Sequence, residues 1–222
     1  MTDDVDVPPL RPPPSTISDP KWLKWAKRLA AVAQNGLAYA TNPFDLERYQ
    51  LVRSIAAEML AAGWAGDGHL IRGRLEREVG HATPKVDVRG VVFRDGQVLL
   101  VKERADGGWT LPGGWADVYD SPSEAVEREI YEESGYRTRA RRLLALYDRA
   151  RHGHPPIPFH AYKAFFLCEL VGGAPAASME TDGVGFFPET ALPELSVTRV
   201  TADQIHRMFA HYYQPDLPTD FD

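Results

Sequence analysis

The feature that most constrains the fold of this sequence is a glycine turn followed by a helix with clear start and stop signals. Both lie in residues 111–136 (LPGGWADVYDSPSEAVEREIYEESGY). The glycine pair at 113–114 predicts a tight turn, because glycine adopts backbone conformations that other residues disfavour. The helix then has an N-cap, a proline at its first position and the partner of a capping box, which are Ser121, Pro122 and Glu124. Gly135 suits the left-handed cap that ends a helix. We therefore expect a turn and then a helix that runs to Ser134.

Three glutamates of this helix share one side of it. At 3.6 residues per turn, Glu129, Glu132 and Glu133 fall within an arc of about 100°, beside apolar positions of the same helix. Crowding and burial both disfavour ionised carboxylates, and Mg2+, which takes oxygen ligands, removes that cost. A solvated, glutamate-rich face with ordinary ion pairs is the alternative. The adjoining glycine turn and helix signals favour the metal site, in which Arg128 can pair with Glu132 at i+4.

The same stretch resembles the Nudix box of the Nudix hydrolases, which reads Gly, five residues, Glu, seven residues, Arg-Glu, an apolar residue, any residue, Glu-Glu, any residue, Gly and an apolar residue. The matching positions here are Gly114, Asp120, Arg128, Glu129, Ile130, Glu132, Glu133, Gly135 and Tyr136. Asp120 departs from the pattern, since the family has the longer Glu there. In the family that position supports the helix more than it binds metal, so we expect activity to survive.

The resemblance implies an α/β/α sandwich with a mixed sheet and a phosphoanhydride hydrolase with Mg2+ as its cofactor, Mn2+ being possible. The implied metal ligands are the Gly114 carbonyl and the acids Glu129, Glu132, Glu133 and Glu180. The implied catalytic residues are Arg128, Glu129, Glu132 and Glu133. Glu180 is included because Nudix enzymes often add one acid from a later loop, to bind metal or activate water; a solvated loop acid is the alternative.

Composition and charge narrow the function classes. The net charge of -6 argues against a broad grip on nucleic-acid phosphates. The single cysteine, Cys168, cannot form an intrachain disulfide and lies in the apolar run AFFLCEL, where a buried thiol is expected. No apolar run reaches membrane-spanning length, and the acidic start MTDD does not resemble a signal peptide. We expect a cytoplasmic protein with no membrane partner.

The N-terminal third predicts a separate helical domain. Residues 1–18 are proline-rich and predict a flexible tail, whereas residues 19–64 carry two amphipathic helical patterns that predict a helical hairpin. A hairpin is too small for a good core, so we expect it to pack on the catalytic domain or on a second copy, as a homodimer. It also resembles the helical domain of a Nudix subgroup that hydrolyses nucleoside diphosphates linked to another group, X, and includes CDP-choline pyrophosphatases. Residues 65–83, with one short helix, are expected to link the domains.

Residues 84–214 predict the catalytic domain, and residues 215–222 a tail. The runs KVDVRGVVFR and QVLLVKER flank Asp95-Gly96, a strong signal for a two-residue hairpin turn. Strand-like runs LLALYDRA and FHAYKAFFLCEL follow the box, and a last helix is expected from about residue 202 to residue 212. Strands mixed with helices in this way also predict an α/β/α sandwich.

Four further residues are candidates for substrate binding: Arg104, Trp115, His152 and His154. An arginine before the box can reach a phosphate, and a tryptophan can stack on a base or enclose a quaternary ammonium, although a solvated arginine and a core aromatic are the alternatives. The two histidines lack an evident third zinc ligand. We interpret their loop as a contact with substrate phosphate or base, with a surface turn as the alternative.

Two classes of function follow. The first is a Mg2+-dependent pyrophosphohydrolase that splits a nucleoside diphosphate linked to X, a small-molecule substrate, into a nucleoside monophosphate and phospho-X. CDP-choline is the first choice, from the N-terminal resemblance, and ADP-ribose or a sugar nucleotide is the alternative. The second class is a non-catalytic nucleotide-sensing module. The nearly intact box argues against it, because a sensor does not need every acid.

Overall fold

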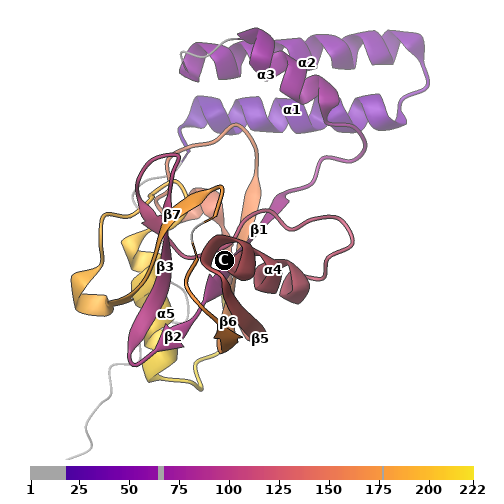
Figure 1. The fold of residues 1–222 in the computed structure, drawn as a ribbon. Helices are drawn as coiled ribbons and strands as arrows, with labels where there is room; N and C mark the ends of the chain where they lie inside the picture. The colour runs from indigo at the N-terminus through magenta and orange to yellow at the C-terminus, as the bar shows by residue number, and fades with distance from the viewer. Residues whose placement is uncertain (1–18, 65–67, 177) are drawn as a thin grey trace, which may run out of the picture. The chain divides into compact units, whose positions relative to one another are not determined.

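The computed structural model describes residues 19–64, 68–176 and 178–222, and these form two compact units (Figure 1). The helical unit consists of the described residues up to 85 together with residues 156–160. The α/β unit consists of residues 86–155 and the described residues from 161 to 222. The expected tail at residues 1–18 lies outside the described residues.

The helical unit contains three helices rather than two. The predicted hairpin is formed by α1 (Lys21–Tyr39) and α2 (Pro43–Trp64), and α3 (Gly68–Arg77) follows it. Leu23, Ala26 and Leu60 form a buried core, against which Ile71 and Leu75 of α3 pack. The expectation that these residues only link two domains is therefore wrong for 68–77, because the apolar side chains of α3 complete the core of the helical unit.

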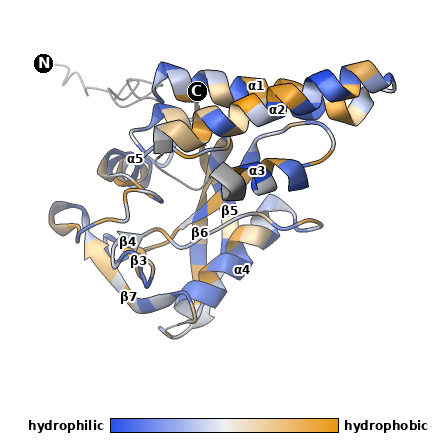
Figure 2. Ribbon diagram, turned by 90° about the horizontal axis from the view of Figure 1, so that it is seen from above, coloured by the Kyte–Doolittle hydropathy of each residue, from blue (hydrophilic) through white to orange (hydrophobic). Residues whose placement is uncertain are grey.

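Several large apolar side chains of the helical unit stay exposed. The hydropathy colouring shows apolar residues along both α1 and α2 (Figure 2). On α2, Ala56, Ala57 and Leu60 are buried, whereas Leu51 and Ile55 on the same helix are 61% and 43% exposed. This helix therefore has more apolar surface than α1 and α3 cover.

The α/β unit has two sheets. The first has the order β1-β6-β5-β8, and in it β5 pairs antiparallel with β6 and parallel with β8, so the sheet is mixed. The second has the order β2-β3-β4, with β7 on the other edge of β3. The strands are β1 (Lys85–Val91), β2 (Phe93–Arg94), β3 (Gln97–Glu103), β4 (Trp109–Thr110), β5 (Tyr136–Asp148), β6 (Ala161–Gly173), β7 (Thr181–Pro188) and β8 (Asp220–Phe221).

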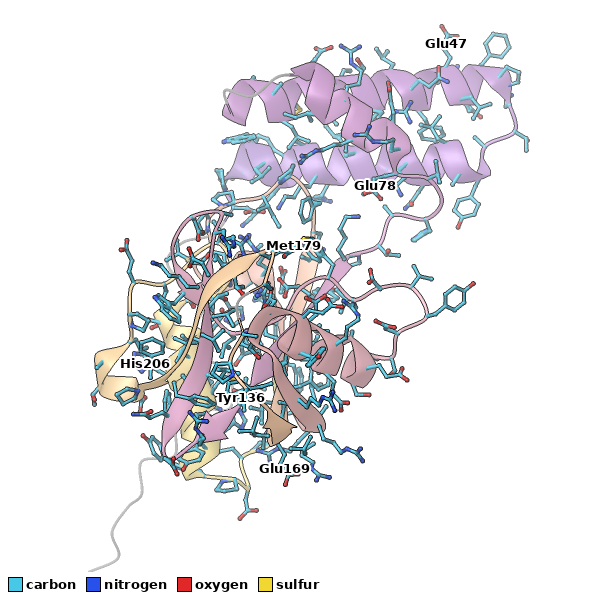
Figure 3. All side chains as sticks on the ribbon, viewed as in Figure 1. Glu47, Glu78, Tyr136, Glu169, Met179 and His206 are labelled. Atoms are coloured by element: carbon cyan, nitrogen blue, oxygen red, sulfur yellow. The ribbon has the colours of Figure 1, made fainter. Side chains whose placement is uncertain are left out.

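Helices pack on two separate apolar clusters of these sheets. Val126 and Ile130 of α4 (Pro122–Ser134) pack with Leu99 of β3, while Ile205 and Phe209 of α5 (Ala202–Tyr213) pack in the other cluster. Side chains fill the spaces between these layers, and the surface positions labelled in Figure 3 include Glu169, Met179 and His206. Short 3-10 turns lie at Arg149–Arg151 and Glu189–Ala191. The predicted mixed α/β fold is confirmed.

Two local predictions also hold, a hairpin turn and a buried thiol. Asp95 and Gly96 form the turn between β2 and β3, both with positive φ (51° and 73°). Cys168 is buried, and burial raises the pKa of its thiol to about 12. Among the described residues, no helix is both long enough and apolar enough to cross a lipid bilayer.

The C-terminal residues are not a tail. Residues 220–221 form β8 beside β5, and Asp220 is 1% exposed. Its carboxylate accepts hydrogen bonds from Arg207 (Nη2, 2.7 Å), from His211 (Nε2, 3.3 Å) and from the Tyr147 hydroxyl (3.1 Å). Burial opposes its charge, but these donors lower the pKa of Asp220 to about 2. The expectation of a tail at 215–222 is wrong because residues 220–221 pair with β5 and Asp220 is buried among partners on α5 and β5.

Candidate active site

The helix that carries the glutamates is built as its sequence predicts. In α4, Ser121 accepts a hydrogen bond from the Glu124 backbone, and the Glu124 carboxylate accepts one from the Ser121 N–H at 2.9 Å, which is the capping box. Gly135 ends the helix with φ at 75°. The cap fixes where the helix starts, and therefore fixes which of its side chains face the glycine turn.

The glycine turn lies between β1 and α4. The Val88 N–H donates to the Gly114 carbonyl at 2.8 Å, so the turn is joined to β1. A Cβ on Gly113, whose φ is 144°, would lie 2.0 Å from the Val88 carbonyl oxygen, and a Cβ on Gly114 would lie 2.8 Å from a carboxylate oxygen of Glu129. Position 113 therefore requires glycine, and the lack of a side chain at Gly114 lets Glu129 approach the turn.

Glu133 is the most deeply held acid of the box. Its side chain is 5% exposed, and its carboxylate accepts a hydrogen bond from the Gly113 N–H at 2.9 Å. Burial raises the pKa of Glu133 to about 8, and the charges of Glu103 and Glu129 add to the rise, although Arg89 and Gly113 oppose it. Glu129 also has a raised pKa, chiefly from burial. A cation placed among these carboxylates would restore their ionised forms.

Arg128 links an acid of the loop before α4 to two acids of α4 itself. Its guanidinium lies 3.0 Å from Asp120 and 3.0 Å from Glu129, and it pairs with Glu132 at 3.1 Å, as the i+4 spacing predicts. Burial works against its charge, but the bond to Asp120 and the charges of Glu129 and Glu132 raise its pKa. Asp120, the departure from the box pattern, is therefore long enough to reach Arg128, as expected for a position that supports the helix.

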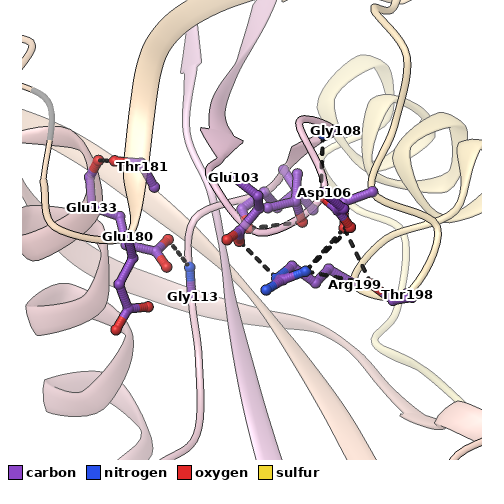
Figure 4. A network of polar contacts seen from close by, with 12 residues as sticks. Glu103, Asp106, Gly108, Gly113, Glu133, Glu180, Thr181, Thr198 and Arg199 are labelled. Carbon is purple, nitrogen blue, oxygen red and sulfur yellow. Dashed lines mark hydrogen bonds and ion pairs between the residues drawn. The ribbon is translucent and has the colours of Figure 1, made fainter.

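Glu180, directly before β7, and Glu103, at the end of β3, lie near the glycine turn and Glu133. Glu180 precedes Thr181, whose hydroxyl donates to the Glu133 carbonyl at 2.7 Å, and its own carbonyl accepts from the Arg104 N–H at 2.9 Å. Glu103, at the end of β3, is 3% exposed and pairs with Arg199 at 2.8 Å. In Figure 4, Glu180 lies beside Glu133, and the carboxylates of Glu133 and Glu103 lie on either side of Gly113.

A buried ionic network supports the turn from β1 and β6. Arg89 pairs with Asp87 at 2.7 Å and donates to the Leu111 carbonyl at 3.1 Å, and Lys163 pairs with the other Asp87 oxygen at 2.7 Å. The cation of Arg89 opposes the rise in pKa of Glu103, Glu129 and Glu133. Burial lowers the pKa of Lys163 to about 7, despite Asp87. Motifs and spacings in the sequence do not indicate this network or Glu103; the signal that points to them is the presence of ionisable residues inside otherwise apolar strands.

The four candidate substrate contacts lie in different surroundings. Arg104 is exposed and donates to the Ser178 carbonyl at 3.2 Å, beside Glu180. Trp115, 45% exposed, follows the glycine turn and forms a backbone β-bridge with Asp87 of β1.

The two histidine candidates bond to other parts of the fold. His152 stacks on Tyr147 and bonds to Asp222 at 3.0 Å. His154 is buried, donates to the Val197 carbonyl at 2.9 Å, and has its pKa lowered by burial to about 3. The structure thus gives both histidines partners within the fold, and their contact with a substrate stays a prediction.

The donor set suits a hard divalent cation. Glu129, Glu133, Glu103 and Glu180 offer oxygen atoms only, and burial and mutual repulsion raise the pKa of the first three. Within the described residues, no three carboxylate, imidazole or thiol groups already converge on one point. The reason is visible in the contacts: Arg128 holds Glu129 and Glu132 while Gly113 holds Glu133. An ion would replace interactions that are present rather than enter a vacant cage.

A glycine turn and an acidic helix on this fold define a hydrolase of phosphoanhydrides. The chain belongs to the Nudix hydrolase family: residues 83–209 match the NUDIX domain, and residues 20–69 match the UDP-X-like, N-terminal oligomerisation domain. It is therefore an enzyme of that family, as the resemblance of residues 114–136 predicts. Nudix hydrolases generally use a divalent metal.

Two similar proteins match the chain over nearly its whole length, and a third matches 63% of it. The putative ADP-ribose pyrophosphatase YjhB of Bacillus subtilis (strain 168) is 45% identical over 202 residues, which are 91% of this chain and 97% of that protein. The crystal structure of a UDP-X diphosphatase is 33% identical, with a TM-score of 0.60, over 90% of this chain and 98% of the other. An ADP-ribose pyrophosphatase from Streptococcus suis 89-1591 is 37% identical, with a TM-score of 0.59, over 63% of this chain and 100% of the other.

Proposed function

We propose that this enzyme is a Mg2+-dependent pyrophosphohydrolase of nucleoside diphosphates linked to a second group, X. The observation that carries the proposal is the buried Glu133, which is fixed by the Gly113 N–H and lies beside other acids whose pKa values are raised. Such an arrangement costs stability in the free protein and suits a bound cation. The products would be a nucleoside monophosphate and phospho-X.

Each residue has a defined part in this proposal. The carboxylates of Glu129, Glu132, Glu133 and Glu180, with the Gly114 carbonyl, would hold Mg2+, with Mn2+ as a substitute. The bound ion supplies neutralisation of the pyrophosphate and a more acidic attacking water. The Gly113 N–H fixes one oxygen of Glu133, and Arg128 orients Glu129 and Glu132 from the side away from the turn. The Gly114 carbonyl already accepts from Val88 and keeps a second lone pair for the ion.

The relatives bear on the choice of X. Two of them are named as ADP-ribose pyrophosphatases, one of these putatively, and a third as a UDP-X diphosphatase. We therefore place ADP-ribose and UDP-linked sugars first among the substrates to test. CDP-choline, the first choice from the N-terminal resemblance, stays in the panel because its pyrophosphate would meet the same acids.

We further propose that the enzyme is a homodimer joined through its helical unit. The match to an oligomerisation domain over residues 20–69 supports this, as do the exposed apolar side chains of Leu51 and Ile55 on α2. Covering such side chains with a second copy would remove apolar area from water.

The test is hydrolysis of ADP-ribose, UDP-glucose, CDP-choline and NADH with and without Mg2+, followed as phosphate released by a coupled phosphatase. We expect Mg2+-dependent turnover of at least one compound, and Glu133→Gln to lower kcat on the order of 10²-fold or more. Glu127→Gln is the matched control, because Glu127 also accepts a backbone N–H, from Ala140 at 2.7 Å, and a glutamine can keep that bond. Tight nucleotide binding without turnover would favour the sensing module instead, and full activity of Glu133→Gln would refute the site.

A further inference from the structure

We propose that Glu103 is a further metal-binding carboxylate of this site, contributed by β3 from outside the box. The proposal rests on the metal site of the proposed function and extends it to a residue that the box pattern does not contain. Four observations carry it: the placement of the side chain, its burial, the charges around it and the position of its arginine partner.

The pairing of β3 with β7 places Glu103 beside the loop that carries Glu180. β3 pairs with β7 in a continuous register from Gln97 to Lys102, and the register shifts between Lys102 and Glu103. Lys102 pairs with Gly183 and Glu103 with Thr181, so the extra residue is Asp182 of β7. The alternation of β3 is kept, and Glu103 lies on the same face of the strand as Leu99, which packs with α4. The next residue, Arg104, donates its N–H to the Glu180 carbonyl at 2.9 Å, so Glu103 is held next to the loop that carries Glu180.

Glu103 belongs electrostatically to the box acids. Its side chain is 3% exposed, and burial raises its pKa, with Glu180 and Asp106 adding to the rise and Arg199 and Arg89 opposing it. The charge of Glu103 in turn raises the pKa of Glu133. Two arginines therefore do not fully compensate the burial of this carboxylate, and further positive charge beside it would stabilise its ionised form. A divalent cation between Glu103 and Glu133 would supply it.

Arg199 pairs with the Glu103 carboxylate and also has other hydrogen-bond acceptors. Its Nε lies 2.8 Å from Glu103, while its Nη1 lies 3.4 Å from Asp106 and 3.2 Å from the Ser196 hydroxyl (Figure 4). Because Arg199 keeps these other acceptors, it can release Glu103 to a cation and stay paired. An arginine that only stabilised the fold at Glu103 would not need this second set of partners.

The experiment measures Mg2+ and Mn2+ binding to the full chain without substrate, as the rise in Tm with added MgCl2 or MnCl2. We expect Glu103→Gln to weaken the apparent affinity for either ion by about 10-fold or more, because a neutral amide replaces a charged ligand. Gln has the size of Glu and its carbonyl oxygen can still accept from Arg199. Asp106→Asn is the matched control, since Asp106 shares Arg199 but lies on the other side of it from Glu103, and we expect its ion affinity to stay within about 2-fold of wild type.

Arg199→Gln distinguishes between two roles of Glu103, that of a metal ligand and that of a partner in a structural ion pair. It breaks the same Glu103–Arg199 contact from the other side, yet keeps the carboxylate and removes the arginine that competes with an ion for it. We therefore expect ion affinity equal to or higher than that of the wild type. If Arg199→Gln weakens Mg2+ binding as Glu103→Gln does, or if Glu103→Gln binds Mg2+ like the wild type, the proposal is overturned. A wild-type protein that binds neither ion overturns it together with the metal site. A wild-type protein that binds Mg2+ through Glu103 but hydrolyses no nucleotide overturns the proposed function alone.

Discussion

At the residue scale, Arg128 explains how the box tolerates Asp in place of Glu at position 120. The guanidinium has four carboxylate neighbours, Asp117, Asp120, Glu129 and Glu132. Two of them belong to the loop before α4 and two to the proposed metal site. Loss of one loop partner therefore leaves the orientation of the site acids in place, whereas loss of the arginine removes every partner at once.

We accordingly expect Asp120→Ala to lower kcat by less than about 5-fold and Arg128→Ala to lower it by about 10- to 100-fold, as for residues that orient metal ligands. Arg128→Lys should fall near Arg128→Ala, because an ammonium cannot serve several carboxylates with one planar fork. Steady-state kinetics of the three variants at saturating Mg2+ decide this. Equal losses in Asp120→Ala and Arg128→Ala would show that the loop contact, and not the site contact, is what matters.

The sequence predicted those residues whose partners are close in the chain. The capping box, the Arg128–Glu132 pair and the Asp95–Gly96 turn depend on spacings of one to four residues, and all three are present. Glu103 was not predicted because its role depends on the pairing of β3 with β7 and on an arginine 96 positions later. Local patterns carry no information on such pairings, which arise only when the sheet forms.

At the element scale, β8 shows the same limit. The run PDLPTDFD has the composition of a solvated end, and nothing in it indicates that Asp220 is buried against α5 and β5. Its partners Arg207 and His211 are four residues apart, one turn of α5, so both reach the same carboxylate. The acid therefore holds α5 and β8 together.

We expect Asp220→Asn to reduce the free energy of unfolding by about 3–5 kcal/mol, because it leaves the buried Arg207 without its counter-charge. Asp216→Asn, an exposed position in the same segment, is the control and should be near neutral. Urea unfolding at pH 7 gives both values. The wild type should lose the contribution of Asp220 only as the pH falls from about 3.8 towards about 2, because its folded pKa is lowered. A neutral effect of Asp220→Asn would mean that β8 contributes no stability.

At the scale of the whole molecule, the α/β unit keeps several charged groups in its interior. Asp87, Arg89 and Lys163 balance one another in a network, whereas Glu103 and Glu133 remain acids whose ionisation burial disfavours. The metal-free fold thus includes an electrostatic cost that the sequence could not reveal, since the sequence shows charges but not which of them are buried. Metal binding and folding stability should therefore be linked through pH.

The sign of that linkage follows from Glu133. Its pKa is raised from 4.5 in the unfolded chain to about 8 in the fold, so between these values the folded state holds a proton that the unfolded state has lost. The contribution is fully present below pH 4.5 and is lost as the pH rises towards 8, at up to about 1.4 kcal/mol per pH unit. Lys163, whose pKa is lowered to about 7, acts with the opposite sign, but only above that pH. Between pH 5 and pH 7, Glu103, Glu129 and His154 also have shifted pKa values. The contribution of Glu133 is therefore isolated by comparing the wild type with Glu133→Gln over this window.

Without metal, the wild type should lose up to about 2.7 kcal/mol of stability relative to Glu133→Gln between pH 5 and pH 7. Glu127→Gln, which keeps the buried acid, should follow the wild-type slope. Mg2+ binds the ionised acid, so its stabilising effect on the wild type should grow over the same window and be weaker in Glu133→Gln. Urea unfolding of the three proteins at both pH values, with and without MgCl2, tests both parts. Parallel pH dependence for the wild type and Glu133→Gln would mean that Glu133 is already ionised in the free protein, and that the fold carries no electrostatic cost for the ion to remove.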